Sequence, residues 1–139
     1  MSISVALEPS GTGRLSRRRR LAARLCVAVA ALLMRLPPVR LRAVLAAASR
    51  GARPASADQA LAARDAVVRT SVRCAGQGCL QRSLATVLLC RLGGTWPDWC
   101  TGVLTEPFRA HAWVEAEGRP VGEGDGMPPF IKTMTVGVR

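Results

Sequence analysis

Residues 74–92 read CAGQGCLQRSLATVLLCRL and decide how the rest of the chain can fold. A glycine-containing loop, residues 74–79, leads into a segment whose apolar residues recur near the 3.6-residue period of a helix. Those residues are Leu80, Leu84, Val87, Leu88 and Leu92. Gly93 and Gly94 follow and predict the end of that helix. Cys79 therefore stands where a predicted helix begins.

An apolar run over residues 25–34 predicts another helix nearer the N-terminus. Four arginines at residues 17–20 precede the run, so the segment resembles the start of a signal peptide or of a membrane span. The run is ten residues long, whereas a bilayer span takes about 20. Arg24 and Arg35 close it at both ends. We therefore predict a buried or amphipathic helix and no transmembrane span.

Two more helices are predicted between this run and the glycine-containing loop. The pair Pro37-Pro38 stops the first helix, and residues 39–49 follow as the second. Residues 50–57 contain Gly, Pro and Ser and are predicted to form a linker. Asp58 is expected to cap a third helix that runs to about residue 71.

The part of the chain after Gly94 predicts strands. Residues 96–99 are expected to form a loop or a short strand. Antiparallel strands are predicted at residues 101–104, 110–116 and 120–123, and residues 130–138 could close the sheet. Because helices precede strands, the predicted fold class is α+β, with N-terminal helices followed by a helix packed on a small antiparallel sheet.

A chain of 139 residues has room for one domain. We expect residues 1–16 to form a disordered N-terminus and residues 17–139 to form a single domain. Within it, residues 17–57 are a basic helical part and residues 58–139 carry the chemistry. The five cysteines are odd in number and do not form the even framework of a secreted scaffold, so the expected localisation is cytoplasmic.

The formal net charge of +11 belongs mainly to the N-terminal half. Residues 1–60 hold eleven arginines and two acids, whereas residues 61–139 hold eight arginines, Lys132 and seven acids. This charge could attract an acidic peptide, a nucleic acid or an anionic membrane as a partner. The alternative is that the arginines only cover solvated helix faces. Aromatic residues that stack on bases are nearly absent from this half, so no nucleic acid is expected.

The histidine and cysteine counts limit the possible chemistry. His111 is the single histidine, which excludes His-rich zinc sites and HExxH metalloproteases. The spacings of Cys74 with Cys79 and of Cys90 with Cys100 fit no common zinc finger or ribbon. We therefore expect neither a metal ion nor a cofactor.

Cys79 is the candidate nucleophile. A helix N-terminus carries partial positive charge and unpaired backbone N–H groups, which lower the pKa of a thiol and can hold a developing oxyanion. The alternative is that Cys79 is a small buried apolar residue, as free cysteines often are. Cys26 and Cys90 lie in apolar segments and are predicted to be buried in that way.

His111 is the only candidate base, and two acids downstream could orient its imidazole, Glu123 and Asp125. A three-residue loop at Glu117-Gly118-Arg119, or a turn centred on Glu117, would place both acids on the face of His111. A two-residue Glu117-Gly118 turn would place both on the opposite face. If His111 does pair with an acid, strand alternation favours the three-residue loop or the turn centred on Glu117. It does not distinguish Glu123 from Asp125.

Three segments together resemble one known family. They are CLQRSLA at residues 79–85, PFRAHAWVE at 107–115 and GRPVGE at 118–123. In this order and spacing they resemble the leader peptidases of lasso-peptide biosynthesis, the protease half of the split B protein. That half is similar to the C-terminal domain of the microcin J25 processing protein. The resemblance covers roughly residues 21–136.

The resemblance implies a transglutaminase-like fold, akin to papain, and a cysteine peptidase with a Cys–His–Asp/Glu triad. Cys79 matches the nucleophile and His111 the general base. The position of the family's acid points to Glu123, with Asp125 as the fallback. Gln77 is a candidate donor to the oxyanion, although a loop glutamine is usually just solvated. Residues 124–129 depart from the family pattern because they are short and rich in Gly and Pro.

The family removes the leader from a ribosomally made precursor peptide. The freed N-terminal amine is then joined to an Asp or Glu side chain by a separate ATP-dependent cyclase. A small leader-recognition-element protein presents the leader, and the segment ahead of the helices is too short to contain that element. The resemblance thus implies three partners, namely the precursor, the recognition protein and the cyclase.

Overall fold

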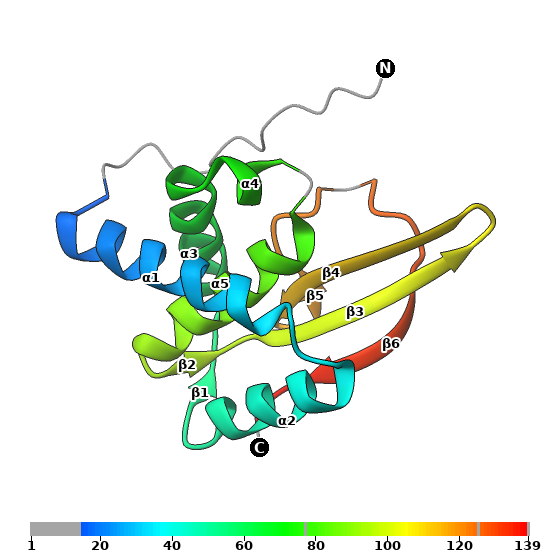
Figure 1. Ribbon diagram of the computed structural model, residues 1–139, viewed down its shortest axis with the longest axis horizontal. Coiled ribbons are helices and arrows are strands. Elements are labelled where there is room, and N and C mark those ends of the chain that lie inside the picture. Colours follow the sequence, from blue (N-terminus) through cyan, green and yellow to red (C-terminus); the bar gives the residue numbers. More distant parts are fainter. Residues whose placement is uncertain (1–14, 77, 125, 139) are drawn as a thin grey trace.

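Helices come first and the sheet follows in the computed structural model, which describes residues 15–76, 78–124 and 126–138 (Figure 1). The α+β prediction is confirmed. The helices are α1 (Arg17–Leu33), α2 (Pro38–Ser49), α3 (Ala57–Thr70), α4 (Val72–Ala75) and α5 (Cys79–Leu92). The strands are β1 (Arg53–Pro54), β2 (Thr95–Trp96), β3 (Asp98–Thr105), β4 (Phe108–Ala116), β5 (Arg119–Pro120) and β6 (Ile131–Val136).

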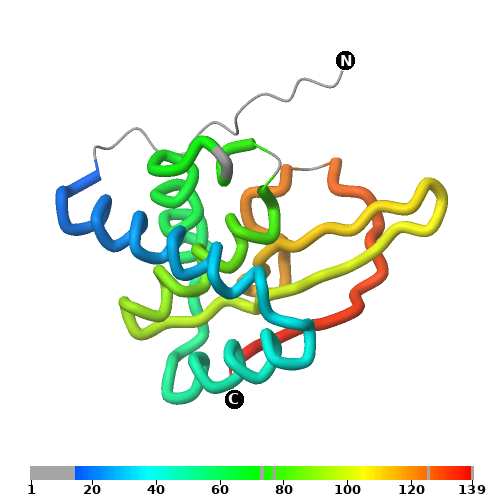
Figure 2. Tube along the Cα trace, viewed as in Figure 1, coloured from blue at the N-terminus to red at the C-terminus, as the bar shows by residue number. Residues whose placement is uncertain are grey.

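Helix α5 is the centre of the fold. It contacts α1 and α3 on the helical side and β4 on the other side, and nine of its residues are buried. The chain path shows the C-terminal strand β6 returning past α2 (Figure 2). The core includes Trp96, Trp99, Leu84 and Leu89. Helix α5, which begins at Cys79, is therefore packed between the other helices and the sheet.

The four-stranded sheet has the order β5-β4-β3-β6, and each pair in it is antiparallel. The prediction that the C-terminal residues close the sheet is confirmed, since β6 pairs with β3. The hairpin of β3 and β4 projects away from the helices (Figure 1). One face of β3 packs on α5, where Trp99 Nε1 donates to Ser83 Oγ over 3.0 Å.

The cap of α3 differs from its prediction. Ser56, rather than Asp58, is the N-cap, because its Oγ accepts the N–H of Gln59 over 3.1 Å. The Gln59 side chain in turn accepts the N–H of Ser56, which completes a capping box. Asp58 lies in the first turn, where a negative charge favours the helix dipole.

Three other segments are more structured than predicted. The linker at residues 50–57 contains β1, which pairs in parallel with β2, and the loop at residues 74–79 begins within the short helix α4. Ser16, expected in the disordered N-terminus, caps α1 by accepting the N–H of Arg19. Residues 1–14 of that predicted segment lie outside the described residues.

Helix α1 is amphipathic, as predicted. Ala23, Cys26 and Ala30 are buried on its inner face, whereas Leu21 and Leu25 are exposed on its outer face. Among the helices of the described residues, none has the length and apolar content needed to cross a bilayer.

The predicted register of the β4–β5 hairpin was wrong. Ala116 pairs with Arg119, so the turn consists of only two residues, Glu117 and Gly118. Both have positive φ, 54° and 77°, which matches the twist that two-residue hairpins require. The Glu117 carboxylate accepts the N–H of Ala57 over 3.0 Å and so ties this turn to the start of α3. The predicted strand at residues 120–123 is reduced to β5.

Candidate active site

Cys79 is the first residue of α5, as the sequence predicted. The preceding residue, Gly78, provides no side-chain cap, and its carbonyl accepts the N–H of Arg82 over 2.8 Å. As at any helix N-terminus, the backbone N–H groups of the first turn have no partner within the helix itself. Cys79 itself is partly exposed, whereas the other four cysteines are buried.

Two groups from β4 meet the Cys79 sulfur. The His111 side chain and the backbone N–H of Ala112 lie close enough to the sulfur for their hydrogen-bonding groups to lower the pKa of the Cys79 thiol. Strand β5 pairs only with Glu115 and Ala116 at the far end of β4. Since β5 does not extend along His111 and Ala112, this part of the β4 edge remains available to the thiol.

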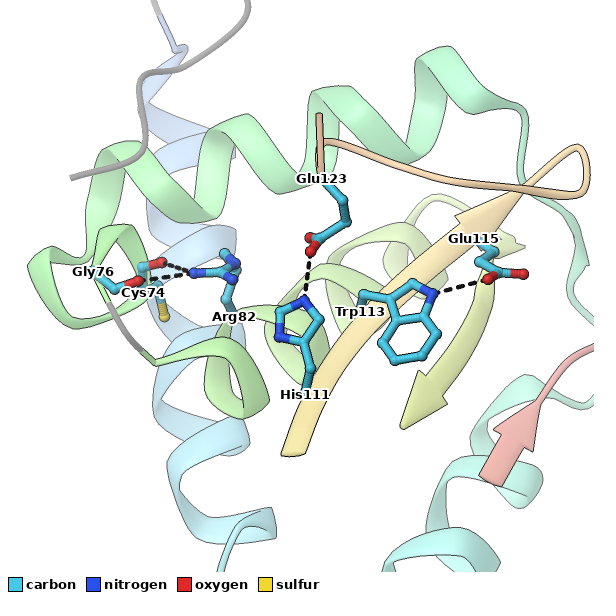
Figure 3. A network of polar contacts seen from close by, with 7 residues as sticks. All are labelled: Cys74, Gly76, Arg82, His111, Trp113, Glu115 and Glu123. Carbon is cyan, nitrogen blue, oxygen red and sulfur yellow. Dashed lines mark hydrogen bonds and ion pairs between the residues drawn. The ribbon is translucent and has the colours of Figure 1, made fainter. Parts of the chain in front are cut away.

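Glu123 lies on the other side of the imidazole. Its Oε1 is 2.5 Å from His111 Nε2, and its side chain is only 10 % exposed (Figure 3). With Nε2 engaged by Glu123, Nδ1 is the ring nitrogen left for the thiol. The structure thus brings Cys79, His111 and Glu123 together. Asp125, the fallback acid, and Gln77, the oxyanion candidate, lie outside the described residues.

Glu123 reaches His111 even though the hairpin has the register that was expected to separate them. The reason is that regular β5 pairing ends at Pro120 and the chain leaves the strand path two residues later, at Gly122. Val121 still donates its N–H to Val114 over 2.9 Å. Gly122 then has a φ of 72°, which turns the chain out of the strand and back toward the imidazole. The prediction from register failed because it assumed a regular strand.

The electrostatics of the site favour a thiolate beside an imidazolium. The hydrogen bond with His111 lowers the pKa of the Cys79 thiol, against the effect of burial, and the N–H of Ala112 lowers it further. Burial by itself would lower the pKa of His111, but hydrogen bonds with Cys79 and Glu123, together with their charges, raise it to about 9. Each member of the pair stabilises the charged form of the other.

Two buried arginines support the loops next to Cys79 and Glu123. Arg82 Nη1 donates to the carbonyls of Cys74 and Gly76 over 3.0 and 3.1 Å, which fixes the chain just before the nucleophile (Figure 3). Arg64 of α3 packs beneath Gly122. Burial, the largest cause, and the charge of Arg82 lower the pKa of Arg64, while Glu123 raises it.

An aromatic wall holds the imidazole from the side. Trp113 stacks on His111 with ring centroids 5.6 Å apart and planes 14° apart, and Phe130 lies 5.2 Å from the same ring. The Trp113 indole donates to Glu115 over 2.9 Å, and Lys132 donates to the other oxygen of Glu115 over 2.8 Å. Figure 3 shows the bond from Trp113 to Glu115 beside the His111 ring. These contacts orient Trp113 and, through its stacking, His111.

Sequence reasoning missed these supporting residues. Trp113 and Glu115 follow His111 at intervals of two, so strand alternation alone would have placed them on its face. Arg82 follows Cys79 by three residues and therefore lies one helical turn away. Arg64 had no such signal, because its contact with Gly122 joins distant parts of the chain.

The other four cysteines are buried. The predictions for Cys26 and Cys90 are confirmed. Burial raises the pKa of Cys26, and it raises the pKa of Cys90 and of Cys100 to about 11 in each case. Within the described part of the chain, no three His, Cys, Asp or Glu side chains form a group that could hold a metal ion.

Comparison with known proteins places this geometry in a family context. The family described as the Transglutaminase-like superfamily matches residues 23–135, which include Cys79, His111 and Glu123. The comparisons with curated proteins and with solved structures give no match.

Proposed function

Because the chain belongs to the transglutaminase-like superfamily, we propose that it is a cysteine peptidase in which Cys79, His111 and Glu123 form the triad. One observation carries this proposal, namely that His111 is 2.5 Å from the Glu123 carboxylate and also lowers the pKa of the Cys79 thiol. Nucleophile, base and orienting acid in such a chain are the arrangement that covalent acyl transfer requires.

In the proposed reaction, the Cys79 thiolate attacks the carbonyl carbon of the scissile amide. The oxygen that becomes negative is stabilised by N–H groups at the start of α5. The C–N bond then breaks as His111 gives its Nδ1 proton to the departing amine, which leaves a thioester on Cys79. Glu123 keeps the imidazole oriented and favours its protonated form before this step.

Hydrolysis completes the cycle. Water attacks the thioester carbonyl while His111 Nδ1 accepts the proton of that water. The C–S bond breaks, the carboxylate product leaves, and the thiolate–imidazolium pair is restored. No metal ion or cofactor is required by these steps.

We propose that the substrate is the precursor of a lasso peptide and that the enzyme removes its leader before macrolactam formation. The support is the resemblance of residues 79–85, 107–115 and 118–123 to the leader peptidases of that pathway. These segments contain the three triad residues. Cleavage would free the amine that a separate ATP-dependent cyclase consumes in the cytoplasm.

A separate leader-recognition protein is the proposed partner. Arg17, Arg18, Arg20 and Arg24 are exposed along α1, and Leu21, Leu25 and Leu32 are exposed on the same helix. A surface that combines positive charge with apolar side chains fits an acidic leader or its carrier. Replacing Arg17 to Arg20 with glutamate should slow processing at low salt, and unchanged processing would remove this assignment.

The deciding experiment incubates the enzyme with its own precursor and follows the products by mass spectrometry. The wild type should release leader and core with a mass gain of one water, and Cys79→Ala and His111→Ala should release neither. Circular dichroism of both variants checks the fold. Full activity of Cys79→Ala would refute the proposal.

The same experiment separates two other functions. A thioester on Cys79 could instead be attacked by an amine, and a product joined with loss of ammonia or peptide would indicate amide formation. The exposed arginines and leucines of α1 also fit an anionic membrane surface. Binding to anionic vesicles without any cleavage of precursor would favour that noncatalytic alternative.

A further inference from the structure

An apolar groove is lined by Leu80, the residue that follows the candidate nucleophile in the chain. Its volume is about 490 Å³, within the range of about 300–1,000 Å³ that is usual for ligand pockets. Met34, Leu36 and Leu41 line it from the α1–α2 side. Leu80 of α5 and Met134 of β6 complete its walls.

The polar atoms at this groove already have partners. Thr101 and Thr133 line it, and their hydroxyl groups hydrogen-bond each other over 2.9 Å. Trp99 also lines it, and its indole N–H donates a hydrogen bond to Ser83 Oγ. The groove therefore offers carbon surface to a ligand and little hydrogen-bonding capacity.

The position of the groove connects it with the reacting sulfur. Leu80 directly follows Cys79, so their Cα atoms are about 3.8 Å apart. Thr101 is the register partner of Ala112, whose N–H binds the Cys79 sulfur. Leu80, the residue after Cys79, and Thr101, the register partner of Ala112, thus connect the surroundings of the thiol with the lining of the groove. A second cavity, at Asp58, Glu117 and Arg119, includes none of these residues.

Resting on the proposed peptidase function, we propose that this groove binds apolar side chains of the peptide substrate next to the bond that Cys79 attacks. An extended peptide advances about 3.3 Å per residue, and alternate side chains share one face. The inference therefore assigns the groove to a residue one or two positions from the scissile bond, about 3–7 Å along an extended peptide. Filling an apolar pocket of this kind changes specificity by about 10–200-fold.

The test uses two electrophiles that differ only in an apolar group, chloroacetamide and N-benzylchloroacetamide. Each labelling rate at Cys79 is divided by the rate of the same compound with glutathione, so that intrinsic reactivity cancels. Wild-type protein should show a benzyl preference of about 10-fold or more. Equal normalised rates would overturn the inference.

Two groove variants and one matched control assign the preference to the groove. Met34→Glu and Met134→Glu place a charge on opposite walls and should bring the ratio of the two normalised rates close to one. Val39→Glu adds the same charge at an 81 % exposed position that does not line the groove, and it should keep the wild-type ratio. A preference that survives both methionine variants would also overturn the inference.

This readout separates the groove from the peptidase function, because labelling requires the thiolate but no peptide cleavage. A benzyl preference without cleavage of any precursor supports the groove and refutes the peptidase. Cleavage of the precursor without a benzyl preference leaves the peptidase standing and refutes the groove.

Discussion

Gly122 lies directly against the guanidinium of Arg64. A Cβ at Gly122 would be 2.5 Å from both Cδ and Nε of Arg64, closer than real carbon contacts permit. Arg64 is 4 % exposed and comes from α3, so it has little freedom to move away. The contact fixes the position of the chain at Gly122, where it turns so that the next residue, Glu123, reaches His111.

Gly122→Ala should therefore lower both activity and stability. The new methyl group must displace Arg64 or the turn, and overpacking of this kind costs about 1–3 kcal/mol. Unfolding by denaturant measures the stability, and precursor cleavage measures the activity. Gly124→Ala is the matched control, because Gly124 has a φ of 73° and no atom within 4 Å of the added carbon. Equal losses in the two variants would attribute the effect to backbone conformation and not to Arg64.

Glu123→Gln should reduce kcat by about 10²–10⁴-fold with little change in fold. The amide keeps a hydrogen-bonding group but loses the negative charge that raises the pKa of His111. The pKa of His111 should fall, and the high-pH limit of cleavage should move to lower pH with it. Glu106→Gln changes an exposed carboxylate away from the site and should behave as wild type. An unchanged pH profile in Glu123→Gln would exclude this role.

Iodoacetamide should modify Cys79 before the other cysteines, and at pH values below those at which an ordinary thiol reacts. The lowered pKa of Cys79 keeps its thiolate present, whereas Cys90 and Cys100 titrate at about 11. Peptide mapping after timed labelling at several pH values measures both effects.

Cleavage and alkylation should diverge at high pH. Above about pH 9, His111 loses its proton and cannot protonate the departing amine, so cleavage should fall while alkylation continues. Parallel decline of the two rates would contradict the assignment of His111 as general acid.

Gly102→Ala should disturb the aromatic wall from the neighbouring strand. Gly102 is the register partner of His111, and a Cβ there would lie 2.8 Å from the Trp113 ring and 2.9 Å from the carbonyl of Ile131. A stability loss of about 1–3 kcal/mol is expected, together with altered tryptophan fluorescence. Gly126→Ala adds the same methyl group in open space and should show neither change. Wild-type fluorescence in Gly102→Ala would contradict this contact.

Glu115→Gln should lower kcat more than it changes KM. The glutamine amide cannot accept from both Trp113 and Lys132 as the carboxylate does, and loss of a charged hydrogen bond costs about 1.5–3 kcal/mol. The indole then loses its fixed orientation against His111. Lys132→Arg keeps a positive donor to Glu115 and should retain kcat. A lower melting temperature with unchanged kcat in Glu115→Gln would show that this network supports only the fold.

Local patterns determined much of this protein from the sequence alone. The 3.6-residue period placed α5, and the glycines on both sides placed its ends, so Cys79 was correctly put at a helix N-terminus. Alternation placed His111 on β4. These features depend on residues within a few positions of one another, where backbone geometry is regular.

The position of the acid was decided by tertiary structure. With the two-residue turn, a regular strand would place Glu123 on the face of the sheet opposite His111. Glu123 nevertheless contacts His111, because Gly122, packed against Arg64, turns the chain back toward it. The segment leaves the sheet after Val121, and its path is set by the packing of Gly122 against Arg64 of α3. Sequence spacing cannot reveal such a path, because the contact that sets it joins residues far apart in the chain and has no period.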